Sequence, residues 1–84
     1  MKVVKKLSEL KIGDSGVITN VVGDGRVRHR MFDMGVTPGA SVFLRKTAPL
    51  GDPIEITLRN YELTLRKTEA ELVMVEVEEE EEEK

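Results

Sequence analysis

The sequence predicts a mostly β fold: a small, strongly bent β-barrel of about five strands, with one inserted helix and a short helical turn before the last strand. Two observations predict it. Apolar and polar residues alternate with a period of two over residues 54–59 and again over 61–66. Helical spacing appears in one long segment, residues 25–34. The chain has 84 residues, which is the size of one small domain.

The predicted strands are short and rich in β-branched residues. Val, Ile and Thr favour extended structure because their branched side chains pack well on a pleated surface. Asn60 joins the third predicted strand to the fourth, and asparagine tolerates the positive φ that a tight turn requires. The five predicted strands cover residues 17–22, 41–47, 54–59, 61–66 and 72–77.

The segment 25–34 is predicted to be an amphipathic helix. Val27, Met31 and Met34 fall at i, i+4 and i+7, on the face expected to reach the core. Asp24 precedes the segment and is expected to be its N-cap. Gly35 follows it, at the position where helices often end in left-handed geometry. The opposite face carries the polar side chains Arg26, His29, Arg30 and Asp33.

Turn chemistry accounts for the connections between these elements. Pro38 and Gly39 stand at the second and third positions of residues 37–40, which is typical of a type II turn. Residues 7–10 and 67–70 each read as one turn of helix. Small barrels of this kind close partly on themselves and so hide their edges. The SH3-like barrel, with a helix inserted after the first strand, is therefore the expected fold.

Composition divides the chain into a domain, residues 1–77, and an acidic tail, residues 78–84. The net charge is −3, of which the tail contributes −5, so the rest of the chain is +2. Six adjacent glutamates repel one another and bury nothing, so the tail is expected to be disordered. With no Cys, no signal peptide and no apolar run near the ~20 residues that span a bilayer, the chain is expected to be cytoplasmic, without direct membrane insertion.

The connection over residues 48–53 is longer and stiffer than chain reversal requires. A minimal hairpin turn needs two residues, whereas this one has six and includes Pro49 and Pro53. Each proline fixes its own φ and pushes the preceding residue toward extended geometry. The loop carries an apolar tip, Leu50. One interpretation is a proline-braced turn without a partner, and the other is a preorganised binding surface.

The chemistry of the remaining side chains favours protein binding over catalysis. The sequence contains no nucleophile arrangement and no phosphate-binding glycine loop. Too few aromatic residues are present for a nucleic-acid stacking platform or a groove for proline-rich peptides, and the tail opposes phosphate. An apolar tip beside cations offers an anchor and a rim. The predicted partner-binding residues are Arg26, Arg28, Arg30, Pro49 and Leu50.

His29 and Asp33 are the only pair that suggests a metal ligand set. They lie one helical turn apart, so both could reach one ion. Two ligands are too few for a firm ferrous site, and Arg26 and Arg30 on the same face would repel a cation. We therefore expect no metal site and no cofactor, beyond a weak association of ferrous iron.

Several motifs fall together in one order along the chain, and two of them, Met-Gly-x-x-Pro-Gly and Ala-Pro-x-Gly-Asp-Pro, are specific in combination. On these residues, segment 7–77 resembles the ferrous iron transport protein A (FeoA) family. The sequence departs from the family at Asn60, where Gly is usual, and at Met31 and Phe32, where Leu is preferred. The residues that carry the resemblance are Leu7-Ser8-Glu9-Leu10, Gly13, Arg30, Met34-Gly35-Val36-Thr37-Pro38-Gly39, Ala48-Pro49-Leu50-Gly51-Asp52-Pro53-Ile54-Glu55-Ile56, Tyr61-Glu62-Leu63, Leu65-Arg66 and Glu69-Ala70.

The resemblance implies an SH3-like barrel and a small cytoplasmic accessory protein without catalytic activity. The implied partner is FeoB, the membrane ferrous iron transporter, whose cytoplasmic portion includes a GTP-binding domain. Similar domains occur at the C-terminus of iron-dependent repressors, so a regulatory SH3-like domain acting on a transcription repressor is the alternative. The lack of a helix-turn-helix segment counts against that alternative.

Overall fold

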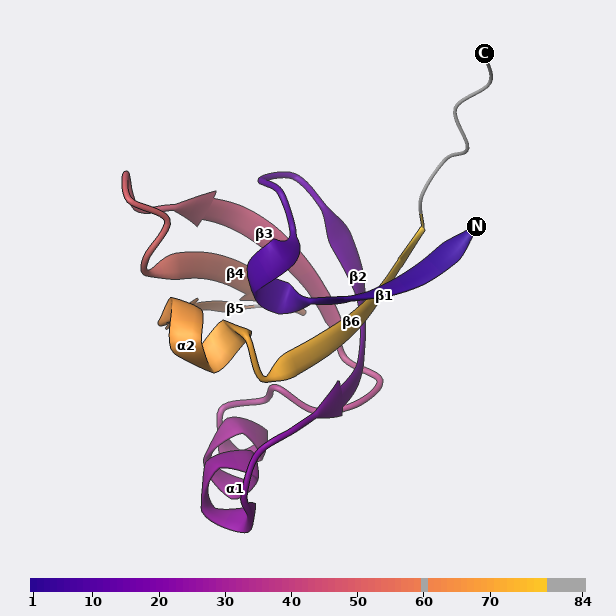
Figure 1. The fold of residues 1–84 in the computed structure, drawn as a ribbon, viewed down its shortest axis with the longest axis vertical. Helices are drawn as coiled ribbons and strands as arrows, with labels where there is room; N and C mark the ends of the chain where they lie inside the picture. Colours follow the sequence, from indigo (N-terminus) through magenta and orange to yellow (C-terminus); the bar gives the residue numbers. More distant parts are fainter. Residues whose placement is uncertain (60, 79–84) are drawn as a thin grey trace.

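The computed structural model describes residues 1–59 and 61–78, which form a single six-stranded antiparallel sheet with three short helical segments (Figure 1). The strand order is β1-β6-β2-β3-β4-β5. The strands are β1 (Lys2–Lys6), β2 (Ser15–Val21), β3 (Ser41–Thr47), β4 (Ile54–Leu58), β5 (Tyr61–Leu65) and β6 (Val73–Glu78). The helical segments are η1 (Leu7–Glu9), α1 (Gly25–Asp33) and α2 (Lys67–Ala70).

The sheet is strongly bent, and register shifts contribute to the bend. One shift lies between Ile18 and Asn20, where β2 pairs with β6, and another lies between Leu44 and Lys46, where β3 pairs with β4. Such irregularities bend a strand and increase its local twist. Within the described residues, β1 and β5 stand at the two ends of the strand order and do not pair with each other. The mostly β prediction is confirmed, as an open, curved sheet.

The structure has one strand more than the five predicted ranges, because β1 was not recognised. Three of its five residues are lysines, so the segment has no clear apolar alternation. In the structure it pairs with β6, from Lys2 opposite Glu78 to Lys6 opposite Met74. An edge strand tolerates lysines, which discourage pairing with other chains. Its position in the sheet, rather than its own sequence, makes this segment a strand.

The interior of the curved sheet is aliphatic. Within the described residues, every buried side chain is apolar. Each fully buried Val, Leu, Ile or Met contributes about 1.5–3 kcal/mol relative to exposure, so these side chains are the main source of stability. The buried set is Leu7, Leu10, Ile18, Val21, Met31, Val36, Ala40, Val42, Leu44, Ile54, Ile56, Leu58, Leu65, Ala70, Val73, Val75 and Val77.

Helix α1 begins and faces the core as predicted. The Oδ1 atom of Asp24 accepts a hydrogen bond from the amide of Val27 at 3.0 Å, which caps the first turn. Met31 is fully buried, while Val27 and Met34 are partly buried against the core. The helix ends at Asp33, one residue earlier than predicted, and Gly35 follows with a φ of 93°. The core-filling role predicted for the methionines is thus correct.

The other predicted turns are also found. The amide of Ala40 donates to the carbonyl of Thr37 at 3.1 Å, and Gly39 has a φ of 92°, as a type II turn requires. The helical turns at 7–10 and 67–70 correspond to η1 and α2. Asn60 lies outside the described residues. Its neighbour Arg59, the residue directly after β4, takes a positive φ of 50°.

The predicted boundary between domain and tail needs one correction. Glu78, assigned from the sequence to the disordered tail, is the last residue of β6. Its Oε2 atom accepts a hydrogen bond from the amino group of Met1 at 2.9 Å. This contact holds the first residue of the chain beside the end of β6. Residues 79–84 lie outside the described part of the chain, so the predicted disorder of the tail remains a prediction.

Candidate protein-binding site

The β3–β4 loop, residues 48–53, is braced by its own backbone. The amide of Ala48 donates to the carbonyl of Pro53 at 2.9 Å, and the amide of Gly51 donates to the carbonyl of Ala48 at 2.7 Å. These bonds hold both ends of the loop together. The side chain of Leu50 projects from it and is 94% exposed. The loop therefore presents one apolar side chain on a closed backbone frame.

Asp52 ties the loop to helix α2. Its Oδ1 atom accepts a hydrogen bond from the backbone amide of Lys67, the first residue of α2, at 2.9 Å. A hollow of about 350 Å³ lies between the loop and α2, and it is lined by Asp52, Pro53, Thr64, Arg66 and Glu69. The side chains of Arg66 and Lys67 are exposed. They supply cations at the base of the loop, in a position that the sequence did not reveal.

The three arginines predicted to bind a partner have different surroundings in α1. Arg30 forms an ion pair with Glu69 of α2, so its charge is already engaged. The guanidinium of Arg28 lies over the ring of Phe32, 5.5 Å from its centroid. Arg26 is exposed and makes no ion pair with another residue of the described chain. All three arginines are exposed, and within the described residues Arg26 and Arg28 are the two that form no ion pair with a carboxylate.

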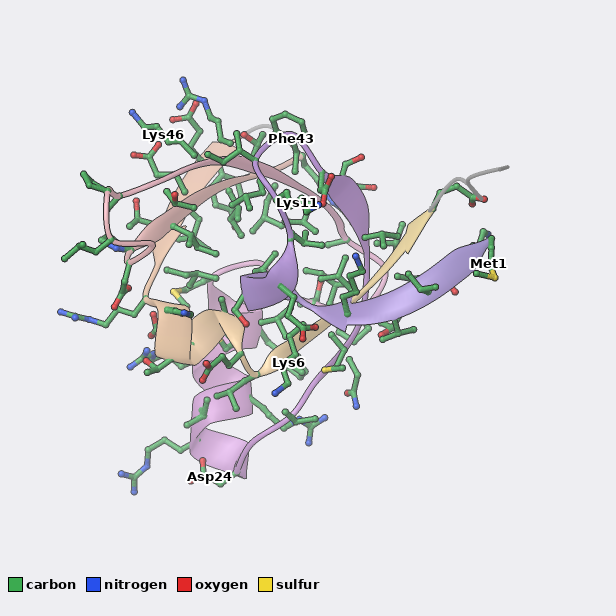
Figure 2. The ribbon with its side chains drawn as sticks, turned by 45° about the horizontal axis from the view of Figure 1, so that its top comes forward. Met1, Lys6, Lys11, Asp24, Phe43 and Lys46 are labelled. Atoms are coloured by element: carbon green, nitrogen blue, oxygen red, sulfur yellow. The ribbon has the colours of Figure 1, made fainter. Side chains whose placement is uncertain are left out.

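Helix α1 and the β3–β4 loop do not form one continuous surface. Figure 1 shows the loop at the upper left and α1 at the bottom, with α2 between them, and the turned view of Figure 2 keeps the same separation. The expectation that the α1 arginines lie beside Leu50 is therefore wrong. The sequence separation of these segments gave no indication of their distance in space. The cations at the base of the loop belong to α2 instead.

His29 and Asp33 do approach each other. The Nε2 atom of His29 lies 3.6 Å from the Oδ2 atom of Asp33, and both side chains are largely exposed. Across residues 1–59 and 61–78, no group of three or more His, Cys, Asp or Glu side chains is arranged to hold a metal ion. The pair is an exposed i,i+4 contact on the helix surface, which contributes little to stability.

A second hollow lies on the outer face of the sheet, where β2, β3 and β4 run side by side. Its volume is about 390 Å³. Two half-exposed apolar side chains, Val17 and Phe43, form its walls. We call this feature the outer groove. Its lining residues are Ser15, Gly16, Val17, Ser41, Val42, Phe43, Thr57 and Arg59. Sequence reasoning missed it, because the register that brings these residues together is not visible in the sequence.

Within the described residues, no helix is long and apolar enough to cross a membrane.

The bent sheet, the braced loop and the inserted helix together define a small SH3-like domain. A FeoA from Stenotrophomonas maltophilia, an SH3 domain protein solved in complex with zinc, has this architecture. It is 27% identical to the present chain and superposes with a TM-score of 0.70 over 82% of this chain and 86% of its own.

The present chain belongs to the FeoA family: the model of the FeoA domain matches residues 5–77. A FeoA-like protein from Clostridium acetobutylicum is 36% identical and has a TM-score of 0.84, over 96% of this chain and 94% of that one. A curated relative from Porphyromonas gingivalis, an Fe(2+) transport protein A/Fe(2+) transporter FeoB fusion protein, is 38% identical over 72 residues. That match covers 86% of this chain but spans only 8% of the fusion protein.

The fold also occurs in a different class of protein. IdeR from T. acidophilum has a TM-score of 0.78 over 89% of this chain and 34% of its own, at 14% sequence identity. This likeness shows a shared fold alone. The FeoA family itself is associated with ferrous iron transport.

Proposed function

We propose that this chain is a small cytoplasmic accessory protein of ferrous iron uptake, which binds the cytoplasmic portion of the membrane transporter FeoB and is not an enzyme. The P. gingivalis relative carries this proposal, because it contains a region 38% identical to this chain in one polypeptide with FeoB. In the fusion protein, the covalent link keeps the FeoA-like region and FeoB at high effective concentration. Where the two are separate chains, we propose that they associate by binding.

The β3–β4 loop supports the proposal physically. Its backbone hydrogen bonds and its contact with Lys67 preorganise it, so binding need not spend much ordering entropy. Leu50, beside Pro49, serves as the apolar anchor. Arg66 and Lys67 of α2 form the charged rim next to it, and Arg26 and Arg28 of α1 contribute longer-range attraction to an acidic partner.

Iron enters this proposal as the transporter's cargo and not as a resident of the chain. The exposed pair of His29 and Asp33 offers at most two ligands, which suits weak and exchangeable association of ferrous iron. The mechanism is therefore one of protein contact, with no chemical step on the FeoA-type domain. The repressor-type alternative rests on fold likeness alone and has no independent support in this chain.

The test is binding of purified variants to the cytoplasmic portion of the cognate FeoB. Leu50→Asp should weaken binding about tenfold or more, since it removes the anchor and adds a charge that must be desolvated. Ile12→Asp is the matched control, because Ile12 is also an exposed apolar residue, 61% accessible, but lies outside the loop. Circular dichroism shows whether each variant folds.

The charged residues give a different kinetic signature. Arg26→Glu with Arg28→Glu should slow association and reduce its salt dependence, with little change in the dissociation rate. If the parent chain shows no detectable binding to FeoB, the proposed function is wrong. If the parent binds but folded Leu50→Asp binds equally well, the loop is not the contact surface.

A further inference from the structure

The outer groove owes its shape to small residues placed between large ones. Ser15 pairs with Phe43, and Val17 pairs with Ser41, so each large side chain lies opposite a serine across the two strands. Phe43 also pairs with Thr57 of β4. The walls, Val17 and Phe43, remain 41% and 42% exposed. The result is an apolar depression on the outside of the sheet, separate from the core.

The groove has a distinctive charge. Among the described residues, Arg59, directly after β4, is its one charged lining residue, and no carboxylate lines it. A fitting occupant therefore carries a single aliphatic side chain for the hollow and a nearby carboxylate for the guanidinium. Ion pairs at the margin of an interface add specificity and speed encounter more than they add affinity.

The chain itself displays such an occupant on the β3–β4 loop. Leu50 is the most exposed large apolar residue described, at 94%, and Asp52 follows two residues later. One oxygen of Asp52 is held by the amide of Lys67, which fixes the carboxylate in place while the residue stays exposed. The loop thus offers an aliphatic side chain and a carboxylate on one rigid frame.

The two features cannot satisfy each other within one molecule, because Leu50 is almost fully exposed in the folded chain. Figure 2 shows that they lie at the same end of the protein: Lys46, just before the loop, and Phe43, at the groove, are both at the top, opposite Asp24 of α1. An interface between two copies at this end would include both features from each copy.

We propose that this chain self-associates through a two-fold interface, in which Leu50 of each copy enters the outer groove of the other and Asp52 faces Arg59. A two-fold interface is self-complementary, so each knob-and-groove contact occurs twice. The competing mode, antiparallel pairing of two β1 edges, would bring together strands that each carry Lys2, Lys5 and Lys6. Like charges opposite each other destabilise such pairing.

The dimer uses the same Leu50 that the proposed function assigns to FeoB. Self-association and transporter binding would therefore exclude each other at this residue. The dimer proposal itself does not depend on FeoB, since both halves of the contact belong to this chain. Variants of the outer groove distinguish self-association from FeoB binding, because they alter the groove and leave Leu50 and its loop unchanged.

Sedimentation equilibrium over a range of protein concentrations tests the proposal. The parent should show a reversible monomer–dimer equilibrium. Leu50→Asp should lower the association constant about tenfold or more. Ser41→Tyr, which fills the groove with an aromatic ring suited to a strand, should do the same. Ile12→Asp is the matched control and should leave the constant unchanged, so an equal loss in this variant would overturn the proposal.

A mixing experiment identifies the contact itself. Leu50→Asp keeps the groove, and Ser41→Tyr keeps the loop, so each variant alone should remain largely monomeric at a protein concentration at which the parent is dimeric. A mixture of the two restores one of the two contacts and should form a heterodimer weaker than the parent dimer. A mixture that associates no more strongly than either variant alone, or a parent that stays monomeric at every concentration, would overturn the inference.

The charged contact is tested by Arg59→Asp, whose aspartate suits the positive φ at this position. This variant should self-associate more weakly than the parent while still binding FeoB. If Arg59→Asp self-associates less and still binds FeoB, both proposals are supported. If the parent does not bind FeoB, only the proposed function is wrong. An association constant unchanged in Arg59→Asp would overturn the assigned pairing with Asp52.

Discussion

The carboxylate of Glu69 in α2 accepts hydrogen bonds from two directions, and one of its partners is Arg30 of α1, 39 residues earlier in the chain. Its other oxygen accepts from the backbone amide of Arg66 at 2.9 Å, directly before α2. One side chain therefore caps a four-residue helix and connects it to α1. Arg30 therefore links α1 to α2, although its side chain remains 63% exposed.

The first prediction concerns this carboxylate. Glu69→Ala should lower the free energy of unfolding by about 1–2 kcal/mol, because it removes a helix cap and leaves Arg30 without its partner. Glu69→Gln can keep the cap through its amide oxygen and should cost less, since exposed ion pairs contribute about 0.2–1 kcal/mol. Urea denaturation measures both, and equal losses would show that the cap contributes nothing.

The second prediction uses two glycines with similar backbones and different surroundings. Gly35 and Gly39 have φ values of 93° and 92°. A Cβ at Gly39 meets no heavy atom within 4 Å, whereas one at Gly35 would collide with the hydroxyl of Tyr61, which donates a hydrogen bond to the Met34 carbonyl. Gly39→Ala should lower the free energy of unfolding by about 1–2 kcal/mol, from backbone strain alone. Gly35→Ala should lower it further, because the collision with Tyr61 adds to the strain.

Tyr61→Phe gives the control for that comparison. It removes the hydroxyl that a Cβ at position 35 would meet, so the double variant should be more stable than the sum of the two single losses predicts. Chemical denaturation of all four proteins provides the cycle. Strict additivity would show that the collision with Tyr61 is relieved in some other way.

The third prediction concerns the anchor of the β3–β4 loop. Asp52→Ala removes the acceptor of the Lys67 amide, so that amide should exchange its hydrogen with solvent about tenfold faster. Asp52→Asn can retain the acceptor oxygen and should show a smaller increase. NMR hydrogen exchange at Lys67 reports the effect, and an unchanged rate in Asp52→Ala would mean that the loop is held by its backbone bonds alone.

The fourth prediction concerns the ends of the described chain. A hydrogen bond from the Met1 amino group, followed by its charge and that of Lys2, lowers the pKa of Glu78. A carboxyl whose pKa is lower in the folded state stabilises the fold above its unfolded pKa, and the contribution disappears as the pH falls through the folded value. Acetylating the Met1 amine should therefore raise the pKa of Glu78, as followed by NMR titration.

The same modification should affect stability in one pH range only. At about pH 6, where carboxylates are ordinarily ionised, the acetylated chain should be slightly less stable than the free one. The difference should vanish in strong acid, where Glu78 is protonated in both. A difference that persists unchanged into strong acid would have to come from something other than this contact.

Local chemistry made several features predictable from the sequence. Asp24, Gly35 and the turn at Pro38 act within a few residues of themselves, so their roles follow from side-chain type and spacing alone. Strand β1 was missed because its lysines are compatible with a strand only at an edge of the sheet. His29 and Asp33, which the sequence offered only as weak candidates for a metal-ligand pair, were correctly placed on one helix face for the same local reason.

The surfaces were less predictable, because they depend on contacts between distant segments. The engagement of Arg30 requires knowing that α2 packs beside α1, and the outer groove requires the registers of three strands. Leu50 and Pro49 were identified from turn chemistry, but their charged neighbours were not. The loop lies next to α2 because Asp52 bonds to Lys67, a pairing that no local pattern reveals.

The wholly aliphatic interior has a consequence for how far such sequences can diverge. Where no described buried side chain is polar, no interior position requires a matching hydrogen-bond partner, and a replacement needs only a suitable volume. Core positions can then exchange one aliphatic side chain for another as long as the total volume is kept. This interchangeability accounts for how the same architecture persists in a protein only 14% identical to the present chain.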